Sequence, residues 1–176
     1  MIKLDYLPYY PSPNKSVRAG GAKPTHIVLH AMVGFYGTQK SGTIGLFLNP
    51  KSKVSAHYLV SRKGEICNMV KDQFAAWHVK NFNSKSLGIE FEDMIPGVKG
   101  NCMTNPNWHT PEQLKAGAEL VATLMLKHNI PIENVMQHSN PFLKKLGNDH
   151  EDCGKWFDEA GFKVLVKEFL DGSKPK

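Results

Sequence analysis

The sequence predicts a single α/β domain with a central mixed β-sheet flanked by helices. Short β-rich segments alternate along the chain with amphipathic helical segments, an order typical of a sheet covered by helices. Two β-rich segments, 54–61 and 65–70, are separated by Arg62-Lys63-Gly64, which indicates an antiparallel hairpin. The chain has 176 residues, of which 41% are hydrophobic, and this fits one domain with one core.

The chain divides into three parts. Residues 1–23 are expected to form an extended arm packed on the domain, because prolines and tyrosines alternate there and proline disfavours both helices and central strands. The folded domain is expected over residues 24–170. The polar residues 171–176 are expected to fray as a tail.

The first strand of the domain is expected at Thr25–Met32, a run of β-branched and apolar residues that contains two histidines. Side chains alternate along a strand, so His26 and His30 point to one face while Ile27 and Leu29 point to the other. His30 therefore lies at the C-terminal end of the strand, the edge at which α/β proteins tend to place their sites.

Capping residues mark the clearest helix, which begins after Thr110. Pro111 occupies its first position, and Thr110 and Gln113 can satisfy each other's backbone donors. Asn129 ends the apolar stripe of this helix. The other expected elements are a short helix at 44–48, a strand at 87–92, a strand at 132–137 and an amphipathic helix at 159–170.

The charge balance is basic. The 22 Lys and Arg residues against 16 Asp and Glu residues give a formal net charge of +6 and a pI near 9.2. This favours anionic partners by long-range attraction, but no dense basic run selects among nucleic acid, cell-wall polymer and membrane. No apolar run approaches the ~20 residues of a membrane helix, and the N-terminus lacks the layout of a signal peptide. We therefore expect synthesis in the cytosol without stable membrane insertion.

Cys67, Cys102 and Cys153 are widely spaced and include no Cys-x-x-Cys pair, so a disulfide framework is not expected. Cys67 lies inside an expected strand and is read as a core residue, and Cys102 as a loop thiol. Cys153 is instead a candidate metal ligand, because it stands with His30 and His138 among the residues at the ends of expected elements. Zinc takes nitrogen and sulfur ligands, and a catalytic zinc uses three protein ligands and a water. The spacing of these three residues alone does not distinguish a zinc site from two histidines and a cysteine that are buried or exposed and bind no metal.

Several motifs in order resemble the zinc-dependent N-acetylmuramoyl-L-alanine amidases of type 2, a fold shared with peptidoglycan recognition proteins and common among phage endolysins. The similarity covers residues 24–170. It rests on Thr25–Ala31 (THIVLHA), Ser55–Tyr58 (SAHY) with Gly64, Ala76–His78 (AWH), Ser86–Glu90 (SLGIE), the helix capped by Thr110, Val135–His138 (VMQH) and Cys153-Gly154.

The resemblance implies one zinc ion per chain, with His30 and His138 at the two histidine ligand positions of the family. Cys153 falls on the third ligand, which is cysteine in one branch and aspartate in another, so Asp152 is the competing candidate. Cys153 is preferred because the run Cys-Gly-Lys-Trp-Phe resembles the cysteine branch, although Gly154 replaces the usual proline.

Glu90 falls on the glutamate that several family members use as an acid/base. Its position agrees with this role, because Glu90 lies on the opposite strand face from Leu87, Ile89 and Phe91. A charge on that face is expected only if the face opens onto a site or onto solvent. Glu92 shares the face and serves as a comparison, since it could be a solvated edge charge.

The group that holds the oxyanion is not assigned by the resemblance. Members often carry a lysine two residues before the third ligand, where this chain has Glu151, and another branch uses a tyrosine where this chain has Ala56. His78 and His150 are the remaining candidates for oxyanion or substrate binding, and His78 could equally be a packing residue. His57 is expected in the core or behind the ligands, and His26, His109 and His128 are expected at surface or packing positions.

The implied function is hydrolysis of the amide bond between N-acetylmuramic acid and L-alanine in peptidoglycan, by a monomeric phage or prophage endolysin released through a holin. The basic charge would attract it to anionic cell-wall polymers, and no nucleic-acid partner is expected. Two alternatives remain. The first is a recognition protein that binds muropeptides without cleaving them. The second is a zinc-free cysteine hydrolase with a Cys153–His138 pair, which is disfavoured because the loop is an unusual setting for a reactive thiol.

Overall fold

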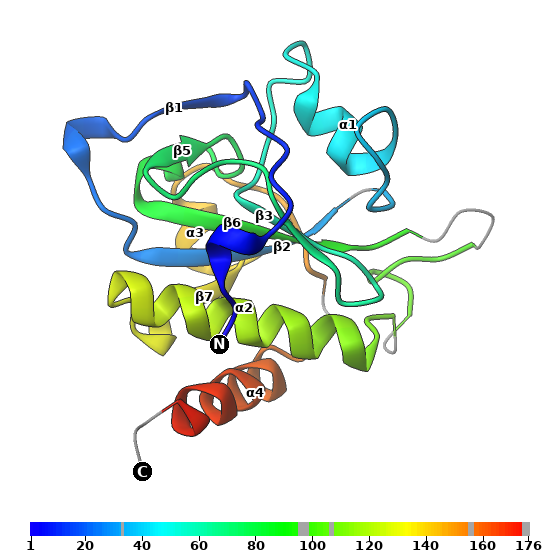
Figure 1. The fold of residues 1–176 in the computed structure, drawn as a ribbon, viewed down its shortest axis with the longest axis vertical. Coiled ribbons are helices and arrows are strands. Elements are labelled where there is room, and N and C mark those ends of the chain that lie inside the picture. Colours follow the sequence, from blue (N-terminus) through cyan, green and yellow to red (C-terminus); the bar gives the residue numbers. More distant parts are fainter. Residues whose placement is uncertain (33, 95–98, 106–107, 155–156, 174–176) are drawn as a thin grey trace.

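A five-stranded sheet forms the centre of the molecule in the computed structural model, which describes residues 1–32, 34–94, 99–105, 108–154 and 157–173 (Figure 1). The strand order is β4-β3-β6-β2-β7. The strands are β2 (His26–Met32), β3 (Tyr58–Val60), β4 (Ile66–Asn68), β6 (Ser86–Glu92) and β7 (Val135–Gln137). β3, β6, β2 and β7 run parallel, whereas β4 pairs antiparallel with β3. The predicted mixed sheet flanked by helices is confirmed.

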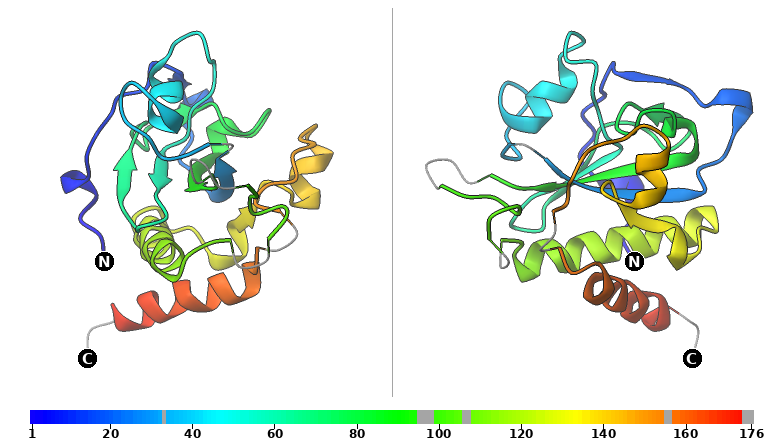
Figure 2. Two further views of the ribbon diagram at one scale, coloured as in Figure 1. Left: turned by 90° about the vertical axis from the view of Figure 1, so that its right-hand side faces the viewer. Right: turned by 180° about the vertical axis from the view of Figure 1, so that it is seen from behind.

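One face of the sheet is covered by α2 (Pro111–His128) and α4 (Glu159–Gly172). Both views in Figure 2 show α2 between the sheet and α4. The main core lies here, because the alternate strand residues Ile27, Leu29, Leu87, Ile89 and Phe91 all point toward these helices and are fully buried.

The other face carries shorter elements. α1 (Gly42–Leu48) packs Ile44 and Phe47 against Met32 and Leu59, and α3 (Pro141–Lys145) packs Leu143 beside Val28. A separate two-stranded sheet joins β1 (Lys15–Val17) to β5 (Phe74–Ala76). Single 3₁₀ turns occur at Leu4–Tyr6, Ala19–Gly21, Asn83–Lys85 and Ile132–Asn134.

The helix caps agree with the sequence-based predictions. The Thr110 hydroxyl accepts a hydrogen bond from the backbone N–H of Gln113 at 3.1 Å, and Asn129 ends α2 in the left-handed conformation. The strand predicted at 132–137 begins only at Val135, because its first three residues form a 3₁₀ turn after Pro131.

The first 23 residues run along the domain and are tied to it at several points. The amino group of Met1 pairs with Glu119 of α2 at 3.1 Å. Further along, the Arg18 side chain is 3% exposed and donates hydrogen bonds to the carbonyls of Asp72, Asn83, Ser84 and Ser86. A buried guanidinium with this many acceptors fixes the arm to the loops around β5. No described helix is long and apolar enough to cross a membrane.

Candidate active site

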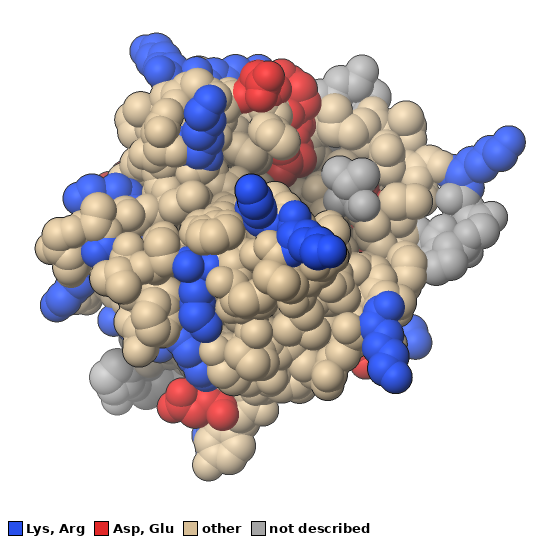
Figure 3. All heavy atoms as spheres, turned by 90° about the horizontal axis from the view of Figure 1, so that it is seen from above, with Lys and Arg blue, Asp and Glu red and all other residues tan. Residues whose placement is uncertain are grey.

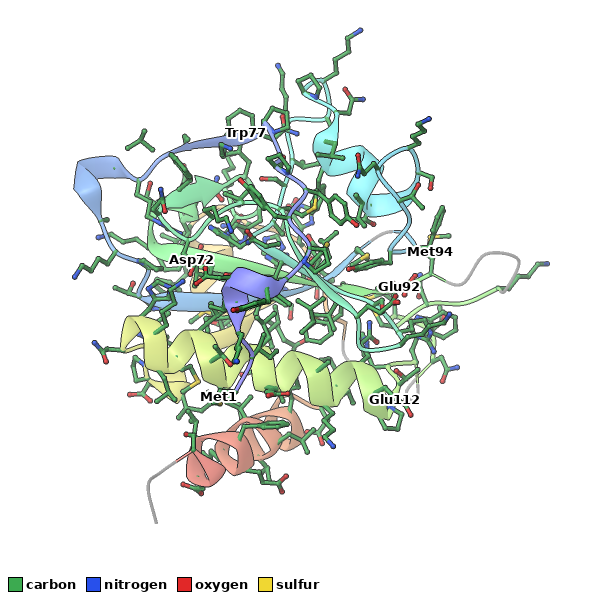
Figure 4. All side chains as sticks on the ribbon, in the orientation of Figure 1. Met1, Asp72, Trp77, Glu92, Met94 and Glu112 are labelled. Atoms are coloured by element: carbon green, nitrogen blue, oxygen red, sulfur yellow. The ribbon has the colours of Figure 1, made fainter. Side chains whose placement is uncertain are left out.

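A pocket of about 310 Å³ opens on the α1 side of the sheet, at the carboxyl ends of the parallel strands. Figure 4 labels Trp77, one of its wall residues, above the sheet. Histidine and carboxylate side chains lie at its polar end, and its apolar wall includes Leu46 and Phe47 of α1. The polar lining residues are Thr43, Ser55, His30, His78, Glu90, His138, His150 and Asp152.

Two parallel strands bring the first two candidate ligands together. His30 lies near the end of β2, and His138 follows β7 and donates its backbone N–H to the Leu29 carbonyl at 3.0 Å. The two rings are 4.6 Å apart, centre to centre, and each histidine is only 3% exposed. These histidines are 108 positions apart in the sequence but neighbours in space because β2 and β7 are adjacent in the sheet.

Asp152 completes the group. Its carboxylate oxygens lie 3.0 Å from His30 Nδ1 and 3.2 Å from His138 Nδ1. One ligand atom from each of these residues can be chosen so that all three lie within 4.8 Å of one another. The loop that carries Asp152 is held in place by the Ser139 N–H, which donates to the Asp152 carbonyl at 2.9 Å.

The ionisation of this group suits a cation. Burial acts to raise the pKa of Asp152, but the close contacts of its carboxylate with His138 and His30 outweigh burial and hold that pKa well below its usual range. Burial lowers the pKa of His30, and the neighbouring Asp152 opposes this only in part. A neutral imidazole beside an ionised carboxylate is the form in which these groups bind a metal ion. The two imidazole nitrogens and the carboxylate oxygen therefore fit zinc.

The structure groups Asp152, the competing candidate for the third ligand, with the two histidines, and it places the preferred Cys153 elsewhere. Cys153 is fully buried in the main core, with Cys102 and Phe157 in the same cluster. Burial, followed by the charge of Asp152, raises the pKa of the Cys153 thiol well above its ordinary value. Cys153 does not line the pocket that holds the two histidines, and this position disfavours the cysteine as a ligand. The group found among the described residues contains Asp152 in its place.

Glu90 enters the pocket from β6. Leu87, Ile89 and Phe91 lie in the core on the other face of this strand, as the alternation predicted. Burial, and then the charge of Asp152, raises the pKa of Glu90 well above its ordinary value. In the described part of the chain no group hydrogen-bonds its carboxylate, so Glu90 is available to a ligand in the pocket.

Glu92, on the same strand face, has a different role. Its carboxylate accepts hydrogen bonds from the backbone N–H groups of Tyr36 at 2.7 Å and Arg62 at 2.8 Å. Figure 4 shows Glu92 on the opposite side of the molecule from Asp72. Glu92 therefore fixes two loops and does not line the pocket.

His78 and His150, the two candidates for oxyanion or substrate binding, both line the pocket but differ in their contacts. His78 Nδ1 lies 2.9 Å from His30 Nε2, on the side of the His30 ring away from Asp152. His150 is 66% exposed and stacks on His138 with a centroid distance of 4.6 Å and an interplanar angle of 10°. With Asp152 as the candidate ligand, the residue two positions earlier is His150 and no longer Glu151.

The remaining histidines lie elsewhere. His57 is fully buried and hydrogen-bonds the Gly88 N–H and the Phe74 carbonyl, which fits the expected core position. His26 hydrogen-bonds the Thr25 hydroxyl at 2.8 Å. His109 lies beside Phe91 and Phe157, and His128 binds Asp72, so none of these three lines the pocket.

The pocket combines a possible metal-binding group with a further carboxylate, a set of residues that suits metal-assisted hydrolysis. The chain belongs to the N-acetylmuramoyl-L-alanine amidase family, whose model matches residues 20–155. This confirms the resemblance found in the sequence and identifies the enzyme as an amidase.

Two relatives give the extent of the sequence similarity. N-acetylmuramoyl-L-alanine amidase A of Achromobacter lyticus is 29% identical over 121 residues, which cover 68% of this chain and 62% of that protein. The chain therefore matches less than two thirds of that relative's length. The 1,6-anhydro-N-acetylmuramyl-L-alanine amidase AmpD of Salmonella typhimurium strain SL1344 is also 29% identical, over 89% of this chain and 88% of that protein.

Solved structures share the fold. A crystal structure of a selenomethionine AmpD derivative superposes with a TM-score of 0.71 at 24% identity, covering 94% of this chain and 96% of that one. The endolysin N-acetylmuramoyl-L-alanine amidase LysCS of Clostridium intestinale URNW gives a TM-score of 0.60 at 22% identity, covering 84% and 86% of the two chains. At these identities the likeness establishes the fold alone.

Proposed function

We propose that this chain is a zinc-dependent amidase that hydrolyses the bond between N-acetylmuramic acid and L-alanine in bacterial peptidoglycan. The observation that carries the proposal is the convergence of His30, His138 and Asp152 in a pocket that also holds Glu90. These three residues would hold one zinc ion per chain, with a fourth position left for water.

When bound, zinc would lower the pKa of its water toward ~7 and polarise the substrate carbonyl. Glu90 would accept a proton from the attacking water and return it to the amine of the departing L-alanine. Its raised pKa suits this task, because the carboxyl must hold the proton between the two steps.

His150 is our candidate for stabilising the negative charge that develops on the carbonyl oxygen. Its exposed ring lies at the pocket and its Nδ1 is 3.8 Å from Asp152, so it can donate an N–H to a substrate bound beside the candidate ligands. His78 is less suited to this role, since its two ring nitrogens are already engaged by His30 and Ser86.

Metal analysis combined with digestion of purified peptidoglycan tests this proposal. The wild type is expected to hold about one zinc per chain and to release peptides with a free L-alanine amino group, and a chelator is expected to stop the release. The substitution Glu90→Ala should retain zinc and lose cleavage. A protein that binds peptidoglycan and never cleaves it would instead support the recognition-protein alternative.

We further propose that the enzyme is a phage or prophage endolysin, made in the host cytoplasm and released to the wall through a holin. The shared fold with an amidase named as an endolysin supports this role. The basic charge supports it as well, because a bacterial wall rich in anionic polymers attracts a protein of net charge +6.

The name of the Salmonella relative raises a second candidate substrate, a soluble 1,6-anhydro-N-acetylmuramyl peptide. The match covers nearly the full length of both chains, and this supports testing the 1,6-anhydro compound as a substrate. An activity assay on equal amounts of intact peptidoglycan sacculi and of soluble 1,6-anhydromuropeptide distinguishes the two roles. An endolysin should cleave the sacculi efficiently, whereas activity confined to the soluble compound would contradict that role.

The attraction to anionic wall polymer has a local basis in the chain. Residues 6–64 contain eight Lys and Arg residues and no Asp or Glu. Lys40 before α1 and Lys51 and Lys53 after it are exposed, and in the described part of the chain they form no ion pair. Figure 3, which looks onto the top of Figure 1 where α1 lies, shows more basic than acidic side chains on this face.

A triple substitution of Lys40, Lys51 and Lys53 to Gln should weaken sedimentation with purified walls. The matched control replaces three exposed lysines elsewhere with Gln, namely Lys85, Lys115 and Lys167. Added salt should weaken wall binding of the wild type, because exposed charges are screened. An equal loss in both triple variants would mean that only net charge matters.

A further inference from the structure

Each candidate histidine ligand turns one ring nitrogen toward Asp152 and the other toward a second partner. His30 Nε2 lies 2.9 Å from His78 Nδ1, and His138 Nε2 lies 3.5 Å from the side-chain oxygen of Asn148. The direction of the hydrogen bonds behind these contacts determines which nitrogen of each ligand carries a proton.

The chain of hydrogen bonds behind His30 begins at Ser86, the first residue of β6. The Ser86 hydroxyl donates its single hydrogen to the Phe82 carbonyl at 2.9 Å. Toward His78 Nε2, 3.2 Å away, Ser86 Oγ can therefore only accept, so that nitrogen carries hydrogen. A neutral imidazole has one hydrogen, so with that hydrogen on Nε2 the His78 ring has a lone pair on Nδ1.

It follows that His78 Nδ1 is the acceptor and His30 Nε2 the donor in the bond between the two rings. The lone pair of His30 Nδ1 then faces Asp152 Oδ2 at 3.0 Å. A lone pair and a carboxylate oxygen at this distance repel each other, unless a cation lies between them or a proton is added. The arrangement is therefore suited to a metal ion.

Asn148 acts on His138 in the same way. Its side-chain nitrogen donates to the carbonyls of Lys80 at 2.9 Å and Leu143 at 3.1 Å, which leaves its oxygen to face His138 Nε2. His138 Nε2 then carries hydrogen, and the lone pair of His138 Nδ1 faces Asp152 Oδ1 at 3.2 Å. Both candidate ligands thus present Nδ1 to the same carboxylate.

We propose that His78 with Ser86, and Asn148 on the other side, are positioning residues that set the ring orientation and the tautomer of His30 and His138 for metal binding through Nδ1. This inference rests on the proposed zinc site. Partners of this kind, behind the ligands of a metal, typically change its affinity by about 10–100-fold.

Zinc affinity, measured by competition with a chelating dye, tests the role of His78. The substitutions His78→Leu and Ser86→Ala should weaken zinc binding, His78→Leu by about 10–100-fold. His78→Asn should bind zinc more tightly than His78→Leu, because its amide oxygen can still accept the His30 Nε2 hydrogen. His26→Leu is the matched control, since His26 lies on β2 with His30 but does not line the pocket. Thermal unfolding of each variant reports on folding.

A second measurement needs no substitution at the positioning residues. In wild-type protein with ¹⁵N-labelled histidines and ¹¹³Cd in place of zinc, the metal should couple to Nδ1 of His30 and His138, and both Nε2 atoms should carry hydrogen. Coupling to Nε2 would overturn this inference but not the proposed zinc site. The same would follow if folded His78→Leu and Ser86→Ala variants bound zinc as tightly as the wild type does. A wild type that binds no metal would overturn the proposed zinc site as well.

Discussion

His30 and Glu90 are register partners on the adjacent parallel strands β2 and β6. Each points to the pocket side of the sheet while its strand neighbours Leu29 and Ile89 point into the core. A slip of one residue in either strand would turn its polar side chain into the core and its apolar neighbours into the pocket. The packing of the core therefore fixes the position of a candidate ligand relative to the candidate proton carrier.

The first prediction concerns Glu90 and pH. A carboxyl whose pKa is raised by folding binds its proton more tightly in the folded state, so its ionisation costs stability. In metal-free protein, this cost should grow as pH rises from about the ordinary value of 4.5 through the raised pKa. Glu90→Gln removes this cost. The free energy of unfolding of the variant minus that of the wild type should therefore increase as pH rises over this range. Chemical denaturation at several pH values measures it, and a pH-independent difference would contradict the predicted burial.

The second prediction separates the adjacent residues Asp152 and Cys153. Asp152→Asn removes a charged candidate ligand with little change in volume and should abolish or strongly reduce zinc binding. Cys153→Ser should keep zinc but lower the free energy of unfolding by about 1–3 kcal/mol, because a hydroxyl replaces a thiol in the core. Metal analysis and denaturation of both variants decide the matter. Loss of zinc from Cys153→Ser alone would restore the cysteine as the ligand.

The third prediction uses the two histidines of β2. His30→Ala should abolish zinc binding while the fold is largely kept, because the apolar face of β2 remains in the core. His26→Ala should leave zinc binding intact, since His26 hydrogen-bonds Thr25 and packs near Phe82 away from the pocket. Circular dichroism and metal analysis test both. Equal zinc contents in the two variants would remove His30 from the ligand set.

The fourth prediction concerns the space that Gly88 leaves for His78. A Cβ atom at position 88 would lie 2.6 Å from His78 Nδ1, so the ring or the strand must shift. Gly88→Ala should lower stability by about 1–3 kcal/mol and weaken zinc binding through His78 and His30. Gly172→Ala is the control, because its added atom would meet nothing within 4 Å. Unchanged zinc affinity in Gly88→Ala would show that the His78 position does not matter.

Regular elements were predictable where one local signal determines them. The apolar run of β2 and the Thr110 cap of α2 each identified their element from neighbouring residues alone. β1, β5 and α3 were not predicted. β1 and β5 are three-residue strands that pair with each other, and α3 is a short helix that begins after Asn140. Such short segments carry too few residues for a periodic pattern.

The candidate site was predictable in part, for a different reason. His30 and Glu90 stand out because each is a polar residue on a strand whose other face is apolar. The sequence left Cys153 and Asp152 as competing third ligands with Cys153 preferred, because the order of residues in a loop does not reveal which of two neighbouring side chains turns into the pocket. The sequence did not indicate that Ser86 contacts His78 or that Asn148 contacts His138, since these contacts join segments that meet only in the folded chain.

The most direct test of the central proposal is the release of L-alanine-terminated peptides from purified peptidoglycan by the wild-type protein before chelation, after chelation and after zinc is restored. We predict release by the zinc-loaded protein, loss of release on chelation and recovery with zinc. In the Asp152→Asn variant zinc should restore no activity. Full release after exhaustive removal of the metal would contradict the zinc-dependent mechanism.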